Sequence, residues 1–255
     1  GRNFKDEDIV RAGLAVPRTS GNGSYDRFRN RLTFAIRDTA GRIVSFGGRS
    51  LDNEEPKYLN GPETPVYDKG RTLFRFHEVE KEIRTTGRAI VVEGYFDAVS
   101  LASAGVPGVV AVCGTALGAG QVGLIRRCAE QVVLLFDGDA AGRRAVHKAL
   151  GPVLAAGLAV RVAVPPDEQD PDDLARQGGR DAVEACLAAA HDVPQFLVAE
   201  AKRNYDVENL DDRVKALGMI LGHLAGIENA IARAEAADRV ADARGVTERA
   251  LRGER

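Results

Sequence analysis

The chain has 255 residues, of which 44% are hydrophobic and 28% are charged, and this composition excludes a wholly disordered protein. Its 35 Lys and Arg residues nearly balance its 37 Asp and Glu residues, which excludes a uniformly basic protein. No apolar run reaches the ~18 residues that a membrane helix needs, and no secretory leader is recognisable, so we expect a cytoplasmic protein without membrane contact.

The charge is unevenly distributed along the chain. Residues 1–90 carry 17 Lys and Arg against 13 Asp and Glu, whereas residues 91–200 carry 8 against 14. Chance variation of surface charge explains such counts, and so does a surface for a polyanion next to a site for divalent cations. The placement of the charges has to decide between these interpretations.

The first 86 residues are predicted to form a loop-rich, mixed α/β subdomain. Two short strands are expected over Leu32–Ile36 and Ile43–Phe46, joined by a hairpin turn at Gly41 and Arg42. Gly, Pro and Asn residues interrupt the rest of this segment, which predicts loops there.

Residues 87–189 alternate short apolar runs with longer helical patterns, which predicts a parallel sheet with helices on its faces and hence an α/β fold. The apolar runs are Ala89–Val92, Gly108–Val112, Gln131–Phe136 and Leu158–Val164. The helical patterns are Phe96–Ala104, Ala119–Ala129 and Ala140–Ala155.

Residues 190–255 are predicted to form a helical subdomain without strands. Amphipathic helices are expected over Pro194–Asn204, Leu210–Ala225 and Glu228–Ala241. A stabilising cap or spacer explains this subdomain as well as a binding role does.

Acidic residues follow three of the four apolar runs. Glu93 comes directly after the first run, Asp137 and Asp139 after the third, and Asp170, Asp172 and Asp173 after the fourth. Because the carboxyl ends of parallel strands share one edge of the sheet, where open α/β folds bind ligands, we expect these side chains to converge.

Converging carboxylates repel one another, by about 4 kcal/mol for two charges ~4 Å apart at an effective dielectric constant of 20. Protonation, basic partners such as Arg143 and Arg144, or bound cations must offset the repulsion. Taken singly, Asp-Gly-Asp is often a solvated turn, and Asp-Pro-Asp-Asp often begins a helix. The joint pattern favours Mg²⁺ or Mn²⁺, which prefer oxygen ligands.

These acidic segments resemble the signature of the Toprim fold, which primases, type IA and type II topoisomerases and some nucleases share. The matching segments are Glu93-Gly94-Tyr95-Phe96-Asp97, Asp137-Gly138-Asp139 and Asp170-Pro171-Asp172. Four earlier segments are similar to blocks of bacterial DnaG-type primases. They are Tyr25-Asp26-Arg27-Phe28-Arg29-Asn30-Arg31, Gly47-Gly48-Arg49, Pro56-Lys57-Tyr58-Leu59-Asn60-Gly61-Pro62-Glu63-Thr64 and Lys69-Gly70.

The resemblance implies a primase core that makes short RNA primers from NTPs on a single-stranded DNA template. It implies a basic N-terminal subdomain over 1–86, a Toprim subdomain over 87–189 and a helical subdomain over 190–255. Two or more Mg²⁺ or Mn²⁺ ions are implied, with Glu93, Asp137 and Asp139 as principal ligands and Asp97, Asp170 and Asp172 in support. The positions implied for template or nucleotide are Arg27, Arg29, Arg49, Lys57, Tyr58, Asn60 and Lys69.

Nucleotidyl transfer assigns an expected role to each principal ligand. Glu93 is expected to hold the catalytic ion and to assist removal of a proton from the attacking hydroxyl. Asp137 is expected to bridge ions, and Asp139 to hold the ion on the triphosphate. Tyr58 suits stacking on a base and equally an ordinary place in the core, and Arg29 suits phosphate and equally a solvated strand face. After Gly114-Thr115-Ala116, where the family usually has a small polar residue, this chain has Leu117.

Two expected parts of a full primase have no counterpart in these residues. The cysteines Cys113, Cys128 and Cys186 form no CxxC pair, so we expect no zinc in this chain. We expect that 255 residues leave no room for the domain that binds the replicative helicase, so that this partner would be reached through a missing C-terminal domain. The resemblance then implies an isolated catalytic core, and we expect a monomer.

Two other functions stay open. A metal-dependent Toprim nuclease would use the same acidic residues but would give the segment from Lys57 to Thr64 no purpose. A non-catalytic Toprim module for nucleic-acid binding would not need to keep Glu93 together with Asp137 and Asp139. A topoisomerase is disfavoured because no gate domain with an active-site tyrosine fits in the chain.

Overall fold

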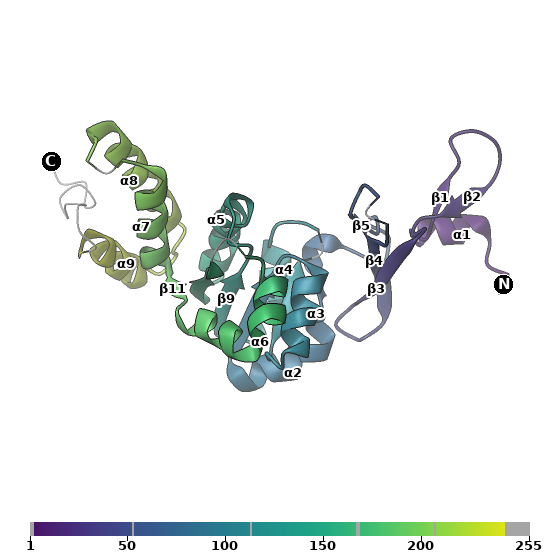
Figure 1. Ribbon diagram of the computed structural model, residues 1–255, viewed down its shortest axis with the longest axis horizontal. Helices are drawn as coiled ribbons and strands as arrows, with labels where there is room; N and C mark the ends of the chain where they lie inside the picture. Colours follow the sequence, from purple (N-terminus) through teal and green to yellow (C-terminus); the bar gives the residue numbers. More distant parts are fainter. Residues whose placement is uncertain (1–2, 53, 113, 167–168, 207, 243–255) are drawn as a thin grey trace.

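The computed structural model describes residues 3–242 except residues 53, 113, 167–168 and 207, so the prediction for Cys113 and the end of the expected helical subdomain lie outside the described residues. Three parts follow one another along the long axis: small sheets near the N-terminus, a central sheet with helices, and a group of C-terminal helices (Figure 1). None of the helices in the described part of the chain has the length and apolar character to cross a membrane.

The N-terminal part begins with helix α1 (Asp6–Arg11) and the antiparallel pair β1 (Ala15–Pro17) and β2 (Ser24–Asp26). A three-stranded antiparallel sheet follows in the order β3-β4-β5. Its strands are β3 (Arg31–Arg37), β4 (Ile43–Ser50) and β5 (Tyr58–Asn60). The predicted hairpin is confirmed, and Gly41 provides the left-handed backbone of its turn with φ +81°. Both strands are longer than predicted.

The central part contains one six-stranded sheet in the order β11-β10-β9-β7-β8-β6. Its strands are β6 (Leu73–Phe74), β7 (Arg88–Val92), β8 (Val109–Val112), β9 (Gln131–Leu135), β10 (Ala159–Ala163) and β11 (His191–Asp192). The four predicted apolar runs form the parallel strands β7 to β10, and the edge strands β6 and β11 pair antiparallel. The expected α/β class is therefore confirmed.

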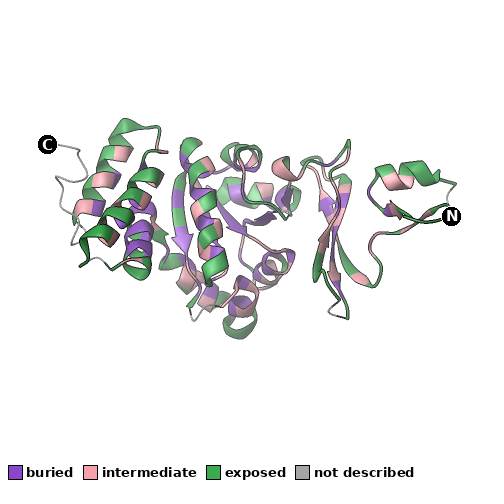
Figure 2. Cartoon of the chain, turned by 90° about the horizontal axis from the view of Figure 1, so that it is seen from above, coloured by how far each residue is buried: buried purple, intermediate pink, exposed green. Residues whose placement is uncertain are grey.

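Helices cover both faces of this sheet because both faces of its strands are apolar. Along β7, Ala89 and Val91 face one core, and Ile90 and Val92 face the other; all four are fully buried. The first face carries α2 (Phe76–Thr86), α4 (Ala119–Arg126) and α5 (Ala140–Ala155), and the second carries α3 (Tyr95–Ser103) and α6 (Pro171–Ala188). Figure 2 shows the buried residues gathered between these layers. A short 3₁₀ helix, η1 (Lys69–Arg71), precedes β6.

The connection order creates a crevice at the carboxyl edge of the sheet. Strand β7 pairs with β8 on one side and with β9 on the other, so the chain leaves β7 in one direction and later returns past it. At such a switch point the loops after the two neighbouring strands diverge to opposite faces. The loops that diverge here carry Glu93 and Asp137.

The C-terminal helices are α7 (Val193–Asn204), α8 (Leu210–Leu224) and α9 (Ala230–Asp242), close to the predicted ranges. Phe196 and Leu197 of α7 are at most 1% exposed and join the same apolar core as α5. The prediction that no strand follows residue 190 was wrong, because β11 pairs with β10. His-Asp has no β pattern, and the pairing forms because Asp192 begins α7 beside the sheet edge.

Candidate metal and nucleotide site

A depression of about 310 Å³, here called the acidic pocket, opens at the switch point. It is lined by residues from β5 and the position before it, from the loop after β7 and the start of α3, from the end of β8 and the loop after it, and from the loops after β9 and β10. The lining residues are Lys57, Tyr58, Asn60, Glu93, Gly94, Tyr95, Phe96, Asp97, Val112, Gly114, Asp137 and Asp170. The pocket thus brings four of the predicted acidic residues together with three of the predicted nucleotide-binding residues.

Glu93 follows the fully buried end of β7 and enters this pocket. Its Oε1 atom is buried and has no hydrogen-bond partner among the described residues. Burial, and then the charges of Asp137 and Asp139, raise the pKa of Glu93 to about 7. A buried polar atom without a partner is costly, so this oxygen marks a position that a ligand would satisfy.

Asp97 lies one turn further, in the first turn of α3. Burial, followed by the charge of Asp137, raises the pKa of Asp97 to about 7. Its Oδ2 atom accepts a hydrogen bond from the Gly94 amide at 2.9 Å, and its Oδ1 atom accepts one from the Asp172 amide at 3.3 Å. Asp97 therefore joins the loop after β7 to the start of α6.

Asp137 and Asp139 lie just before α5. Burial and the charges of Asp170 and Asp139 raise the pKa of Asp137. Asp139 is exposed and begins α5 by accepting a hydrogen bond from the Gly142 amide at 2.8 Å. A Cβ atom at Gly142 would overlap the backbone of Asp137. The glycine therefore lets α5 pack closely against the loop that carries Asp137 and Asp139.

The third acidic segment is divided between two tasks. Carboxylate oxygens of Asp170, Asp172 and Asp173 lie within 4.8 Å of one another. Asp170 lines the pocket and also begins α6, accepting a hydrogen bond from the Asp173 amide at 2.7 Å. Asp172 is not in the lining; it accepts a hydrogen bond from Ser100 Oγ and lies 3.6 Å from Arg176 Nη1.

The carboxyl groups that line the pocket have the properties of a site for divalent cations. Three of its carboxyl groups have raised pKa values for the same two reasons, burial and neighbouring negative charge. Arg143 was expected to neutralise some of this charge, but it pairs with Glu200 on α7 instead. Cations would remove both costs, and a cluster of carboxylate oxygens is the donor set that hard divalent ions prefer.

A basic and aromatic surface borders the acidic pocket. The Arg49 guanidinium lies 4.2 Å from the ring centre of Phe96 and 5.6 Å from that of Tyr58. The Lys57 ammonium lies 5.9 Å from the Tyr58 ring centre. Tyr58 is 41% exposed, so it is not a core tyrosine. Asn60 Oδ1 accepts a hydrogen bond from Tyr95 Oη at 2.6 Å, which couples β5 to the start of α3.

Three predicted nucleotide-binding residues lie elsewhere. Arg27 and Arg29 line a separate depression beside Arg31, where the Arg29 guanidinium lies 4.6 Å from the Tyr25 ring centre. Arg27 Nε is buried without a hydrogen-bond partner among the described residues. Lys69 is in η1, where its carbonyl oxygen accepts a hydrogen bond from Gln121.

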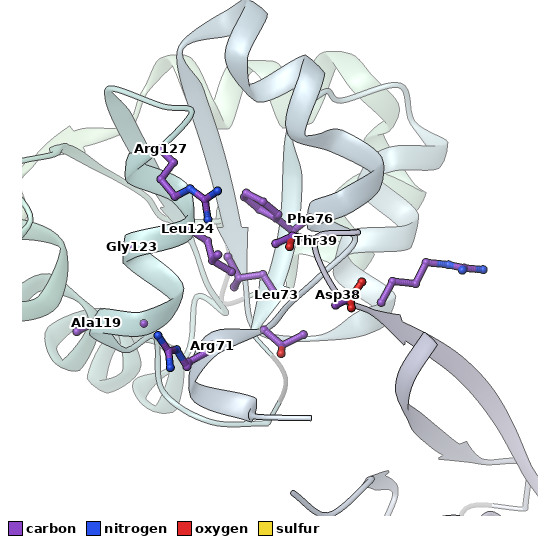
Figure 3. A pocket seen from close by; sticks show the side chains of 12 residues that line it. Asp38, Thr39, Arg71, Leu73, Phe76, Ala119, Gly123, Leu124 and Arg127 are labelled. Atoms are coloured by element: carbon purple, nitrogen blue, oxygen red, sulfur yellow. The ribbon is translucent and has the colours of Figure 1, made fainter. Parts of the chain in front are cut away.

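Another depression, of about 470 Å³, lies between the β3–β4 hairpin, η1, α2 and α4. Figure 3 shows Arg71 and Arg127 on either side of Leu73 and Leu124. The carboxylate of its lining, Asp38, is bound by Arg42 at 2.7 Å. This depression therefore lacks the converging acidic groups that distinguish the acidic pocket.

Sequence reasoning missed several residues that shape the site. Tyr95 and Phe96 line the pocket, and only the resemblance to the Toprim signature drew attention to them. Gly142 carried a usable signal, because it follows Asp-Gly-Asp at the position where a helix begins. Glu200 carried none, since its contact with Arg143 joins residues 57 positions apart.

A Glu after β7 and an Asp-Gly-Asp segment after the neighbouring β9, at the switch point of a mostly parallel sheet, define a Toprim domain. The family model of that domain matches residues 87–164. The model described as the DNA primase catalytic core, N-terminal domain, matches residues 1–80, and that of the DnaB-helicase binding domain of primase matches residues 194–249.

Solved structures and curated proteins agree with these matches. A DNA primase domain from Pseudomonas aeruginosa is 34% identical with a TM-score of 0.87, over 99% of this chain and 80% of that one. A DnaG primase catalytic domain bound to ssDNA is 35% identical with a TM-score of 0.82, over 95% of this chain and 77% of that one. The DNA primase of Myxococcus xanthus is 42% identical over 83% of this chain and 35% of its own length. The chain therefore belongs to the DnaG-type DNA primase family. It spans about a third of the length of the curated relatives that it matches.

One expectation about partners needs correction. The helicase-binding part was expected to be missing because of the chain's length, yet the helicase-binding model matches residues 194–249. The expectation was wrong because length alone does not show which function a helical segment has. The segment that was open to interpretation as a spacer is the one that matches.

Proposed function

We propose that this chain synthesises short RNA primers from NTPs on single-stranded DNA by nucleotidyl transfer that depends on divalent cations. The observation that carries the proposal is the buried, unpartnered Glu93 Oε1 beside Asp137, in a pocket that Lys57 also lines. Such a pocket combines ligands for cations with a positive charge for phosphate. Membership of the primase family supports the choice of reaction.

In this proposal Glu93, Asp137 and Asp139 hold Mg²⁺ or Mn²⁺ ions, and Asp97 and Asp170 support them. Bound ions supply activation of a hydroxyl and neutralisation of phosphate charge. Lys57 and Arg49 bind phosphate, and Tyr58 offers an exposed ring for stacking on a base.

We further propose that the depression around Arg27 and Arg29 binds the template. Three arginines, Arg27, Arg29 and Arg31, line it and outnumber the two carboxylates of Glu54 and Glu55. The buried Arg27 Nε has no hydrogen-bond partner among the described residues. The similarity to a primase catalytic domain bound to ssDNA supports binding of a DNA template by this chain. We assign no direct part to Asp172, whose carboxylate contacts Ser100 and Arg176, or to Lys69, which lies in η1 outside the pocket lining.

We also propose that the C-terminal helices take part in docking a replicative helicase. Leu210, Val214 and Leu221 of α8 are 63%, 60% and 37% exposed. Exposed apolar side chains on one helix are suited to contact with a partner protein. The match to the helicase-binding model supports this role.

The decisive experiment supplies single-stranded DNA, labelled NTPs and Mn²⁺ or Mg²⁺ and looks for labelled oligoribonucleotides. Glu93→Gln should abolish their synthesis, and Glu130→Gln, an exposed carboxylate just before β9, should not. Cleavage of DNA without incorporation of NTPs would support the nuclease alternative. DNA binding with neither reaction would support a non-catalytic module.

A further inference from the structure

Arg143 links the Asp137–Asp139 loop to a helix far away in the sequence. It lies in the first turn of α5, where its Nε atom donates a hydrogen bond to the Gly138 carbonyl oxygen at 3.2 Å. Gly138 stands between Asp137 and Asp139. The same guanidinium donates from Nη1 to Glu200 Oε1 of α7 at 2.6 Å. One planar group thus holds both the loop and the helix.

Glu200 is one of the few charged residues that the structure buries, at 3% exposure. Burial favours its neutral form, but hydrogen bonds from His147 and Arg143 prevail and lower the pKa of Glu200. His147 Nε2 lies 3.6 Å from Glu200 Oε2, and Asn204 Nδ2 donates to Oε2 at 3.5 Å. These contacts fix the carboxylate in place and thereby fix the guanidinium that it binds.

A buried ion pair is a weak source of stability, because desolvation of both charges offsets most of their attraction. The role of the Arg143–Glu200 pair therefore has to be inferred from the groups that it contacts. The Arg143 guanidinium is bound by the Glu200 carboxylate and not by a carboxylate that lines the acidic pocket. What it does contact is the backbone between two of the proposed cation ligands.

We propose that Glu200 is a positioning residue which, through Arg143, holds the Asp137–Asp139 loop in the geometry that binds divalent cations. The inference rests on the proposed function, since it concerns the same cation site. It places a determinant of that site in α7, within the segment matched by the helicase-binding model.

The test measures Mn²⁺ affinity directly, by titration calorimetry and by the electron paramagnetic resonance signal of free Mn²⁺. Arg143→Met should weaken Mn²⁺ binding ~10-fold, the lower end of what loss of a group that orients metal ligands costs. Arg144→Met is the matched control, because Arg144 is the exposed neighbour on the same helix and its loss changes the net charge equally. That control should bind Mn²⁺ within twofold of the original chain.

Glu200→Gln should weaken Mn²⁺ binding to a similar extent, whereas Glu208→Gln, on the exposed surface nearby, should have no effect. The double variant R143M/E200Q should bind Mn²⁺ no more weakly than Arg143→Met alone, because Glu200 acts through Arg143. It also leaves neither charge buried without its partner, so it remains folded if a single variant does not. Thermal unfolding identifies any loss of fold.

Equal Mn²⁺ affinity of Arg143→Met and Arg144→Met, with the unaltered chain binding the ion, would refute the positioning role and leave the proposed function standing. Additive losses in the double variant would also refute it. Failure of the unaltered chain to bind Mn²⁺ would overturn the proposed function itself, and this inference with it.

Discussion

Glu93 illustrates how a binding site stores unfavourable free energy at a single residue. Its pKa of about 7 means that the folded chain holds a proton that the unfolded chain, with a carboxyl pKa near 4.5, releases. Its contribution to stability is therefore fully present below about pH 4.5 and is lost as the pH rises through 7. Above pH 7 the ionised group opposes folding unless a cation binds.

We therefore expect Glu93→Gln to raise Tm relative to the unaltered chain at pH 8 without divalent ions, and to leave it nearly unchanged at pH 5. The partial exposure of the group reduces the effect to about 1 kcal/mol, or roughly 2–4 °C for a chain of this size. Calorimetric unfolding with EDTA measures both values. A variant that is less stable than the unaltered chain at pH 8 would contradict the prediction.

Gly142 controls how closely α5 approaches Asp137. Gly142→Ala should sharply reduce primer synthesis and Mn²⁺ binding, because the new Cβ atom meets backbone atoms of Asp137 that cannot turn aside. Gly151→Ala in the same helix is the control, since a Cβ atom there meets nothing within 4 Å. It should keep full activity and gain about 0.5–1 kcal/mol from better helix propensity. Equal activity of the two variants would show that Asp137 tolerates displacement.

At the scale of single elements, the N-terminal sheet contributes to the acidic pocket through β5 and through Lys57, the residue just before it. Lys57→Ala should weaken binding of single-stranded DNA and reduce the dependence of log Kd on log salt concentration by about 0.7, the loss of one phosphate contact. Lys81→Ala, on the exposed side of α2, should leave that slope unchanged. Fluorescence anisotropy over a salt series measures it, and an unaltered slope in Lys57→Ala would remove Lys57 from the phosphate-binding residues.

The elements also show how far the sequence determines this fold. The helix over Ala140–Ala155 and the four parallel strands were predicted almost to the residue. Long periodic patterns and buried apolar runs can be recognised from consecutive residues, without knowledge of distant contacts. Helix α6 was missed, since its Gly178-Gly179 pair breaks the pattern and Gly179 has φ 63° and ψ −161°. Strands β6 and β11 have two residues each, too few for a sequence pattern, and they form only because they pair with β8 and β10.

The candidate site also combines features that the sequence predicts with features that depend on contacts between distant segments. Glu93, Asp137 and Asp170 were predicted to converge because strand order alone brings their loops together, and they line one pocket with Asp97, which only the resemblance implied. Asp139, Asp172 and Asp173 were predicted at the same edge of the sheet but are not among the residues that line the pocket. The outward contacts of Asp172 and the pairing of Arg143 with Glu200 depend on side-chain packing between distant segments. No local pattern encodes such contacts, so the roles of these two residues were open to error.

At the scale of the whole molecule, the central sheet and the C-terminal helices share one apolar core, whereas α1 buries no residue at all. Unequal burial predicts unequal local stability. The N-terminal elements around β1 and β2 should open first, and the parallel strands should open last. This arrangement leaves the depression around Arg27 and Arg29 on the least stable part of the chain.

Phe196 tests whether that shared core makes one cooperative unit. Its ring is 1% exposed and lies 5.4 Å from the His147 ring of α5, so it joins the helical segment to the Toprim part. Phe196→Ala should cost about 3–5 kcal/mol and lower the hydrogen-exchange protection of β7 and β9 as well as that of α7. Phe4→Ala, at a residue that is 71% exposed, should change neither. Loss of protection confined to α7, α8 and α9 would instead show that the helices unfold independently of the sheet that carries the proposed cation ligands.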